Sequence, residues 1–135
     1  MTNFLRACYS GESETIMFLI GRYPWVIDHS IDENSNNGLH LASLESRMDT
    51  VVYLIDNLEM DPAVKGQHGR NTFLLACYAG NIKIVKYLAE RYPQLINSVD
   101  ENNNNGLHLA VWQDKMDTVE YLIEELGMPV RYPQE

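Results

Sequence analysis

The sequence predicts an all-α solenoid of four helix-turn-helix repeats joined by hairpin-like loops. The stretch from Asn105 to Ala110 has the same six letters as the stretch from Asn37 to Ala42. The alanine that closes this motif recurs at intervals of 35, 34 and 34 residues, as Ala7, Ala42, Ala76 and Ala110. A period of this length is typical of a solenoid in which each unit is one supersecondary element.

A longer rhythm is superimposed on the basic period. The pattern of residues 4–11 returns at residues 73–80, and Arg-Tyr-Pro at 22–24 returns at 91–93. Repeats one and three are therefore one type and repeats two and four another, as in a duplicated two-repeat block. We expect a single domain over 1–135, with repeats at about 2–34, 35–68, 69–102 and 103–130, and an end segment at 131–135.

Each repeat contains two stretches with helical periodicity. In repeat one, Thr2 is a candidate N-cap for a helix that ends at Gly11, and a second helix runs from about Ser13 to the residues before Tyr23 and Pro24. The same reading predicts helices at 39–44 and 48–58, 73–78 and 82–88, and 107–112 and 116–126. Polar turn-forming residues predict loops at 28–37, 59–71 and 97–105.

Composition narrows the function classes. The chain has 135 residues, of which 45% are hydrophobic, enough to bury a core if the repeats stack. No run approaches the roughly eighteen apolar residues of a membrane span, and the N-terminus lacks a signal-peptide pattern. We therefore expect an intracellular, cytoplasmic protein, or a fragment of one, with no membrane partner. The net charge of −9 repels phosphate backbones, so nucleic acid is not expected as a partner.

The two cysteines occupy equivalent places in repeats one and three. Because packed helices lie roughly 8–10 Å apart, two repeats of stacking would separate Cys8 from Cys77 by about 20 Å. A disulfide needs Cα atoms within about 7 Å, so we expect two buried small apolar residues. No histidine recurs beside either thiol, which argues against a catalytic nucleophile.

The repeat motifs resemble those of the ankyrin-repeat family. The family's Thr-Pro-Leu-His-x-Ala corresponds to residues 37–42 and 105–110, and its Gly-x-x-x-Val-Val-x-Leu-Leu corresponds to residues 80–88. The resemblance extends from Thr2 to about Val130 and implies a scaffold that binds a protein partner. Repeats one and four would be the caps of the solenoid.

Two departures from the family pattern concern the backbone. At the hairpin tip, where the family has glycine, this chain has Ser35, Gly69 and Asn103, of which serine fits a left-handed backbone least well. Where the family has Thr-Pro, repeats two and four have Asn-Gly. Asparagine still caps the helix, but Gly38 and Gly106 lose the φ angle that proline fixes, which predicts a looser helix start.

Histidines and carboxylates are the candidates for chemistry. His40 and His108, with His29 and His68 as further ligands, suggest a metal site, but His40 and His108 stand two repeats apart, too far to share one ion. The resemblance instead implies that they hydrogen-bond backbone between repeats. No phosphate-binding loop, nucleophile elbow or Cys-x-x-Cys is present. We expect no metal, no cofactor, no small-molecule substrate and no enzymatic activity.

The resemblance places the second residue after each motif alanine on the concave groove. These four large residues, which we call the groove row, are Tyr9, Leu44, Tyr78 and Trp112. They are typical of an interface hot spot, with Tyr78 and Trp112 as the primary candidates; the alternative is that they only pack against one another. Neighbouring hairpin residues, which we call the tip residues, would line the edge of the groove: Glu33, Asn34, Asn36, Gln67, His68, Arg70, Glu101, Asn102 and Asn104.

The sequence thus predicts a scaffold that binds a protein partner through the groove row and the tip residues. A second hypothesis is a structural spacer or targeting module cut from a larger multidomain protein.

Overall fold

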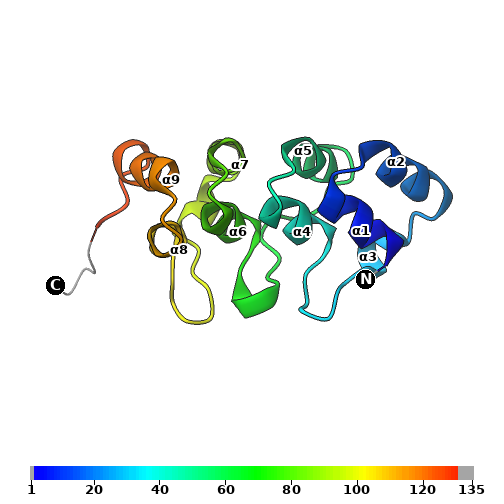
Figure 1. Ribbon diagram of the computed structural model, residues 1–135, viewed down its shortest axis with the longest axis horizontal. Helices are drawn as coiled ribbons and strands as arrows, with labels where there is room; N and C mark the ends of the chain where they lie inside the picture. Colours follow the sequence, from blue (N-terminus) through cyan, green and yellow to red (C-terminus); the bar gives the residue numbers. More distant parts are fainter. Residues whose placement is uncertain (1, 131–135) are drawn as a thin grey trace.

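The protein is built of four helix pairs stacked in a row (Figure 1). This computed structural model describes residues 2–130, and the predicted end segment at 131–135 lies outside them. The first helices form one layer, and the second helices form a second layer above it. The first layer consists of α1 (Asn3–Ser10), α4 (Gly38–Leu44), α6 (Thr72–Ala79) and α8 (Gly106–Trp112). The second layer consists of α2 (Ser13–Arg22), α5 (Met48–Asp56), α7 (Ile82–Arg91) and α9 (Met116–Glu120).

The long loops project from the first layer, away from the second (Figure 1). No β-strand occurs among residues 2–130, so the predicted all-α solenoid is confirmed. No helix in this part of the chain combines the length and the apolar character that crossing a membrane requires.

The caps explain why the first helices begin and end where they do. The Thr2 hydroxyl accepts a hydrogen bond from the Leu5 amide at 3.2 Å, and α1 ends at Gly11 with φ of 71°. In repeat three, the Asn71 side chain accepts from the Leu74 amide at 3.0 Å. These contacts satisfy amides that the helix itself leaves unpaired. The predicted helix from Thr2 to Gly11 is confirmed.

The core lies between the two layers and continues from repeat to repeat. Fully buried side chains come from every helix pair, and burying each contributes roughly 1.5–3 kcal/mol. The largest are Phe4, Leu5, Ile16, Leu39, Leu54, Phe73, Leu74, Ile84, Leu88, Leu109 and Leu122. Each repeat packs on its neighbours, so stability is close to a sum of local terms.

The Asn-Gly departure has a packing reason. A Cβ on Gly38 would lie 2.7 Å from the Cys8 sulfur of the preceding repeat, and Gly106 has the same relation to Cys77. Both glycines are buried, and a capping box between Asn37 and His40 supports the start of α4. Glycine therefore stands in the family's proline position because a cysteine on the first helix of the preceding repeat occupies the space that a side chain would need.

Both cysteines are free and buried, as predicted. Burial in apolar surroundings raises the pKa of Cys8 to about 12 and raises that of Cys77 as well. Both thiols therefore stay neutral near pH 7 and contribute as small apolar side chains.

The loops contain short helical turns that the sequence analysis did not predict. They are α3 (Val26–His29), η1 (Gln67–Gly69) and η2 (Pro93–Asn97). Proline at the first position of η2 fixes a helical φ, which explains why a turn forms directly after α7. The last predicted helix, at 116–126, is helical through Glu125, but its second half is a π-helical segment, η3 (Tyr121–Glu125), which follows directly on α9.

The three hairpin tips share one backbone shape. Ser35, Gly69 and Asn103 have φ of 68°, 71° and 66°, all left-handed. In each hairpin an amide donates to the carbonyl four residues ahead at 2.9 Å, as from Asp32 to Asn36 and from Asp100 to Asn104. Serine thus adopts the left-handed conformation despite its Cβ, which costs roughly 1–2 kcal/mol.

Candidate interaction groove

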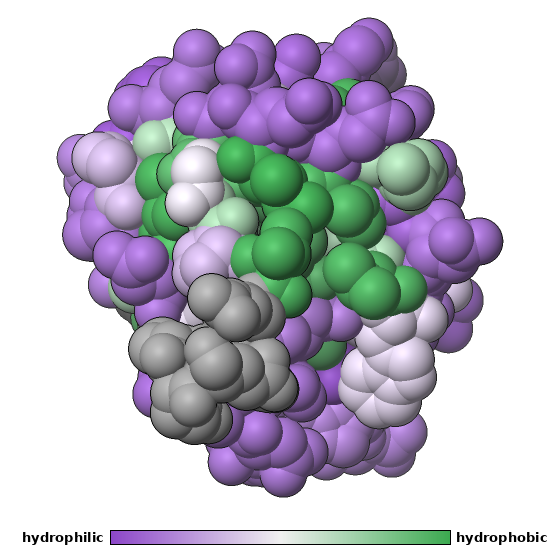
Figure 2. All heavy atoms as spheres, turned by 90° about the vertical axis from the view of Figure 1, so that its left-hand side faces the viewer, coloured by the Kyte–Doolittle hydropathy of each residue, from purple (hydrophilic) through white to green (hydrophobic). Residues whose placement is uncertain are grey.

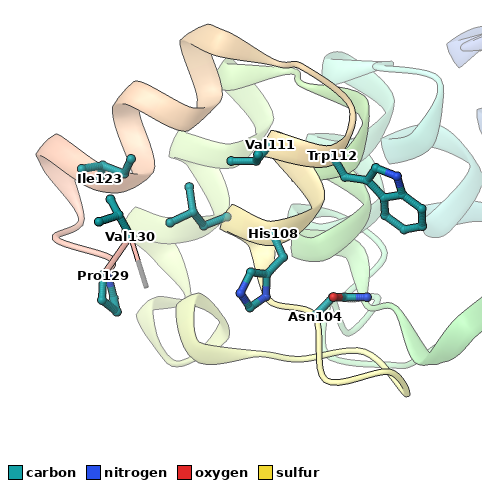
Figure 3. A pocket seen from close by; sticks show the side chains of 8 residues that line it. Asn104, His108, Val111, Trp112, Ile123, Pro129 and Val130 are labelled. Carbon is teal, nitrogen blue, oxygen red and sulfur yellow. The ribbon is translucent and has the colours of Figure 1, made fainter. Parts of the chain in front are cut away.

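The groove row lies at the C-terminal ends of the first helices, one residue per repeat. Tyr9 is 40% exposed and Trp112 is 68% exposed, whereas Leu44 and Tyr78 are half-buried. Figure 3 shows the Trp112 side chain pointing away from Ile123 and Pro129. The row is therefore open at its two ends and partly filled in the middle.

An arginine covers the ring of the central tyrosine. The guanidinium carbon of Arg70 lies 5.1 Å from the centre of the Tyr78 ring, within cation–π range. Arg70 Nε also donates to Asp100 Oδ2 at 3.2 Å. The contact joins two hairpins thirty residues apart and fixes the guanidinium over the aromatic ring.

Asp100 organises the third hairpin. Its carboxylate accepts hydrogen bonds from the amides of Asn102 and Asn104, both at 2.9 Å, as well as from Arg70. Burial alone would raise the pKa of Asp100, but the hydrogen bonds from Asn104, Arg70 and Asn102 lower it below its ordinary value. Asp32 makes the same pair of amide contacts in the first hairpin. Both turns are thus held by hydrogen bonds within the chain.

By exposure of their side chains, the tip residues are half-buried, exposed or, in two cases described below, buried. Gln67 and Asn104 are half-buried. The exposed group consists of Glu33, Asn34, His68, Glu101 and Asn102.

Two tip residues are not available at the edge of the groove, and for these the sequence prediction is wrong. Asn36 is 3% exposed, because its Oδ1 accepts from the Gln67 amide of the next hairpin at 3.1 Å. Arg70 is 9% exposed because of its contact with Asp100. Both link hairpins to each other. The second link is continued by the Glu101 amide, which donates to the His68 carbonyl at 3.0 Å.

The motif histidine hydrogen-bonds the backbone, as the family resemblance implied, but both partners of His40, Asn37 and Val64, lie within repeat two and not in a neighbouring repeat. His40 Nδ1 accepts from the Asn37 amide at 3.0 Å, and Nε2 contacts the Val64 carbonyl at 2.7 Å, across the loop that leads to repeat three. His108 Nδ1 accepts from the Asn105 amide in the same way. Burial lowers the pKa of His40, so the ring is neutral near pH 7. Among residues 2–130, no three His, Cys, Asp or Glu side chains lie together as a metal site requires.

Sequence reasoning missed one surface, the outer side of repeat four. Figure 2 views the molecule from this end and shows apolar side chains gathered across it. A pocket of about 370 Å³ lies there, lined by Asn104, Leu107, His108, Val111, Trp112, Ile123, Pro129 and Val130. The outer side of repeat four is therefore apolar around this pocket. The signal was present in the sequence, because Val111 stands where repeat two has Ser43.

Comparisons with known proteins agree with this architecture. A family model described as ankyrin repeats in three copies matches residues 39–131. A chain in the crystal structure of the yeast ribosomal protein Rps3 in complex with its chaperone Yar1 has the same fold, with a TM-score of 0.82. The two chains are 13% identical, and the match covers 96% of this chain and 94% of that chain.

Curated relatives are much longer than this chain. The target of rapamycin complex 2 subunit AVO2 of Saccharomyces cerevisiae is 27% identical over 118 residues, which is 87% of this chain and 28% of that protein. Alpha-latrocrustotoxin-Lt1a of Latrodectus tredecimguttatus is 27% identical over 123 residues, which is 90% of this chain and 8% of that protein. Because the family match covers more than half of the chain and the fold agrees with it, the chain belongs to the ankyrin-repeat family.

Proposed function

We propose that the chain binds a protein partner through the groove row and the exposed tip residues. The observation that carries the proposal is Trp112, a large aromatic side chain that is 68% exposed at the end of helix α8. Aromatic residues of this kind dominate the energetics of protein interfaces. Tyr9 provides a second exposed aromatic at the far end of the same row.

The middle of the groove supports this proposal through preorganisation. Arg70 is held by Asp100 and stacked on Tyr78, so the half-buried Tyr78 ring loses little side-chain entropy when a partner covers it. A partner that covers the row would bury Trp112 and Tyr9 while Tyr78 provides a surface that is already in place. Of the two primary candidates, Tyr78 and Trp112, we therefore assign the main energetic role to Trp112.

Charge indicates the chemistry of the partner. The chain carries a net charge of −9, and two of the exposed tip residues are Glu33 and Glu101. Opposite charge accelerates association and disfavours wrong partners. We propose a partner segment that presents apolar side chains to the groove row and lysine or arginine to the tips.

The test compares aromatic truncations on and off the groove. Partners captured from lysate are identified, purified and titrated against wild-type protein and variants. Trp112→Ala should weaken binding by about 2 kcal/mol, or roughly thirtyfold, with the melting temperature nearly kept. Phe18→Ala is the matched control, since Phe18 is 58% exposed on the outer helix α2. Equal affinities for wild type and Trp112→Ala would place the binding site elsewhere.

A second candidate function is a spacer or targeting module within a longer protein. It is favoured by one observation, that the chain spans only 28% and 8% of its two curated relatives. One of those relatives is a subunit of a protein complex, and the similar solved chain comes from a complex of a protein with its chaperone. Both observations favour partner binding over the spacer. If every captured partner binds the groove variants as tightly as it binds the wild-type protein, the result would favour the spacer or targeting module.

A further inference from the structure

A crevice between repeats one and two combines apolar walls with exposed carboxylates. It lies between the first hairpin and the loop after α5, and its volume is about 360 Å³. We call it the loop crevice. None of its lining residues belongs to the groove row or to the tip residues. The lining residues that carry its chemistry are the apolar Ile31, Leu58, Met60 and Val64 and the acidic Glu59 and Asp61.

The apolar part of the loop crevice is open to solvent. Ile31 is 60% exposed and Val64 is 45% exposed, while Leu58 and Met60 are half-buried. This exposure does not depend on where the chain begins or ends, because the repeats on both sides of the crevice are present. A concave site of this volume, with apolar walls and a few polar groups, is typical of a site for a small ligand.

Hydrogen bonds within the chain hold the loop that lines the crevice. The Val64 carbonyl contacts His40 Nε2 at 2.7 Å, and the Met60 amide donates to the Leu54 carbonyl at 3.0 Å. The Asp61 carboxylate accepts from the amide two residues ahead at 2.9 Å. A ligand that enters the crevice would therefore order little further backbone, which favours binding.

Glu59 occupies a backbone position that suits glycine. Its φ is 58°, and the equivalent residue in repeat four is Gly127, with φ of 69°. Glycine adopts this left-handed conformation without the clash that a Cβ makes, and glutamate is not among the residues enriched there. Asp61 stands where repeat four has Pro129. Repeat two thus has carboxylates at two positions where repeat four has none, one of them on a strained backbone, and such strain clusters at functional sites.

The charge at the crevice complements a cation. Glu59 and Asp61 are both exposed, and among the residues that the structure describes no lysine or arginine lines the crevice. An ammonium group could stay hydrated beside the two carboxylates while its alkyl chain lies against Ile31 and Val64, as the long stem of a lysine does on apolar surfaces. The same carboxylates would repel an anionic ligand.

We propose that the loop crevice binds a small aliphatic amine in its ammonium form. The volume of the crevice is near the lower end of the range for small-molecule sites, whereas a stable protein interface needs about 800 Å² on each partner. The occupant is therefore a free amine and not a protein segment. The site is separate from the concave groove and does not depend on the proposed groove partner.

The test titrates hexylammonium and its uncharged counterpart, hexanol, into the isotope-labelled full chain at constant ionic strength. Chemical shifts in nuclear magnetic resonance spectra report the affinities. The amide signals of Met60 and Val64 should move with both ligands. Hexylammonium should bind about fivefold more tightly than hexanol, which is the upper range for exposed ion pairs.

Charge variants assign this preference to the crevice. The double variant Glu59→Gln, Asp61→Asn should bind the two ligands equally, with its affinity for hexanol unchanged. The matched control is Glu124→Gln, Glu125→Gln, which removes the same charge from two exposed positions on repeat four and should keep the preference for hexylammonium.

Two single variants separate the apolar wall from the backbone. Ile31→Ser should weaken the binding of hexylammonium and hexanol alike, because the wall contacts the alkyl chain of both. Glu59→Gly should raise the melting temperature, since the backbone is left-handed, and should reduce the preference for hexylammonium.

Three results would overturn the proposal: equal affinities of the two ligands for the wild type, loss of the preference in the Glu124→Gln, Glu125→Gln control, or shift changes confined to residues outside the crevice. A lysine blocked at its α-amino and carboxyl groups that binds more tightly than hexylammonium would overturn it too, because the occupant would then be a protein side chain. None of these variants changes Tyr9 or Trp112, so the groove proposal is tested independently.

Discussion

Replacing Gly38 by alanine tests the packing between repeats one and two. The added methyl would lie 2.7 Å from the Cys8 sulfur and 3.1 Å from Phe4 Cε2, well inside the 3.5–4.0 Å at which carbon atoms attract. Overpacking of this kind costs about 1–3 kcal/mol, whereas alanine gains at most about 1 kcal/mol over glycine in a helix. We expect the free energy of unfolding to fall by about 1–2 kcal/mol.

A double-mutant cycle with Cys8→Ala, measured by urea denaturation, isolates the clash. Removing the sulfur makes room for the methyl, so Gly38→Ala should cost at least about 1 kcal/mol less in the Cys8→Ala background. Gly21→Ala is the matched control, because its Cβ would meet nothing within 4 Å on α2; it should stabilise the protein slightly. Additivity within about 0.5 kcal/mol, or stabilisation by Gly38→Ala, would refute the packing argument.

Three further predictions concern the hairpins and their titrating groups. Ser35→Gly should raise the free energy of unfolding by about 0.5–1 kcal/mol in thermal melts, because φ is 68°; a loss of stability would contradict the left-handed tip. His40 has a folded pKa below 6.5, so the unfolded chain takes up the proton first and stability should fall as pH drops below 6.5. In urea titrations across pH the His40→Asn variant should show a flatter slope, and an unchanged slope would remove His40 as the cause. Asp100 has a folded pKa below 3.8, so its contribution is present above that pH and lost below it. Acid unfolding monitored by circular dichroism should show that Asp100→Asn loses stability at pH 7 and flattens the acid limb; an unaltered acid limb would contradict the role of this carboxylate.

Local signals were sufficient to predict the repeats. The alanine period gives the length of one repeat in residues, and helix ends are marked by local hydrogen bonds at Thr2, Gly11, Asn71 and Gly80. The short turn α3 was missed because its four residues are too few for a helical periodicity to be visible.

The side-chain contacts between repeats could not be predicted from the sequence pattern. Arg70 is a charged residue in a predicted loop, where an exposed side chain is expected. Its side chain is buried through its contact with Asp100, thirty positions away in the sequence. Asn36 is withdrawn from the groove in the same way by the Gln67 amide. The place of Trp112 on the groove row came from the family resemblance, while its exposure depends on which repeats surround it.

The most direct measurement of the central claim uses the two tryptophans, Trp25 and Trp112. The variant Trp25→Phe leaves Trp112 as the reporter in the groove, and Trp112→Phe leaves Trp25, which is 58% exposed beside α3 at the far end of the chain. If the partner covers the groove, titrating it should shift the fluorescence of Trp112 to shorter wavelength and protect it from quenching by acrylamide. The emission of Trp25 should stay unchanged. A saturating partner that leaves Trp112 fully quenchable would contradict partner binding through the groove.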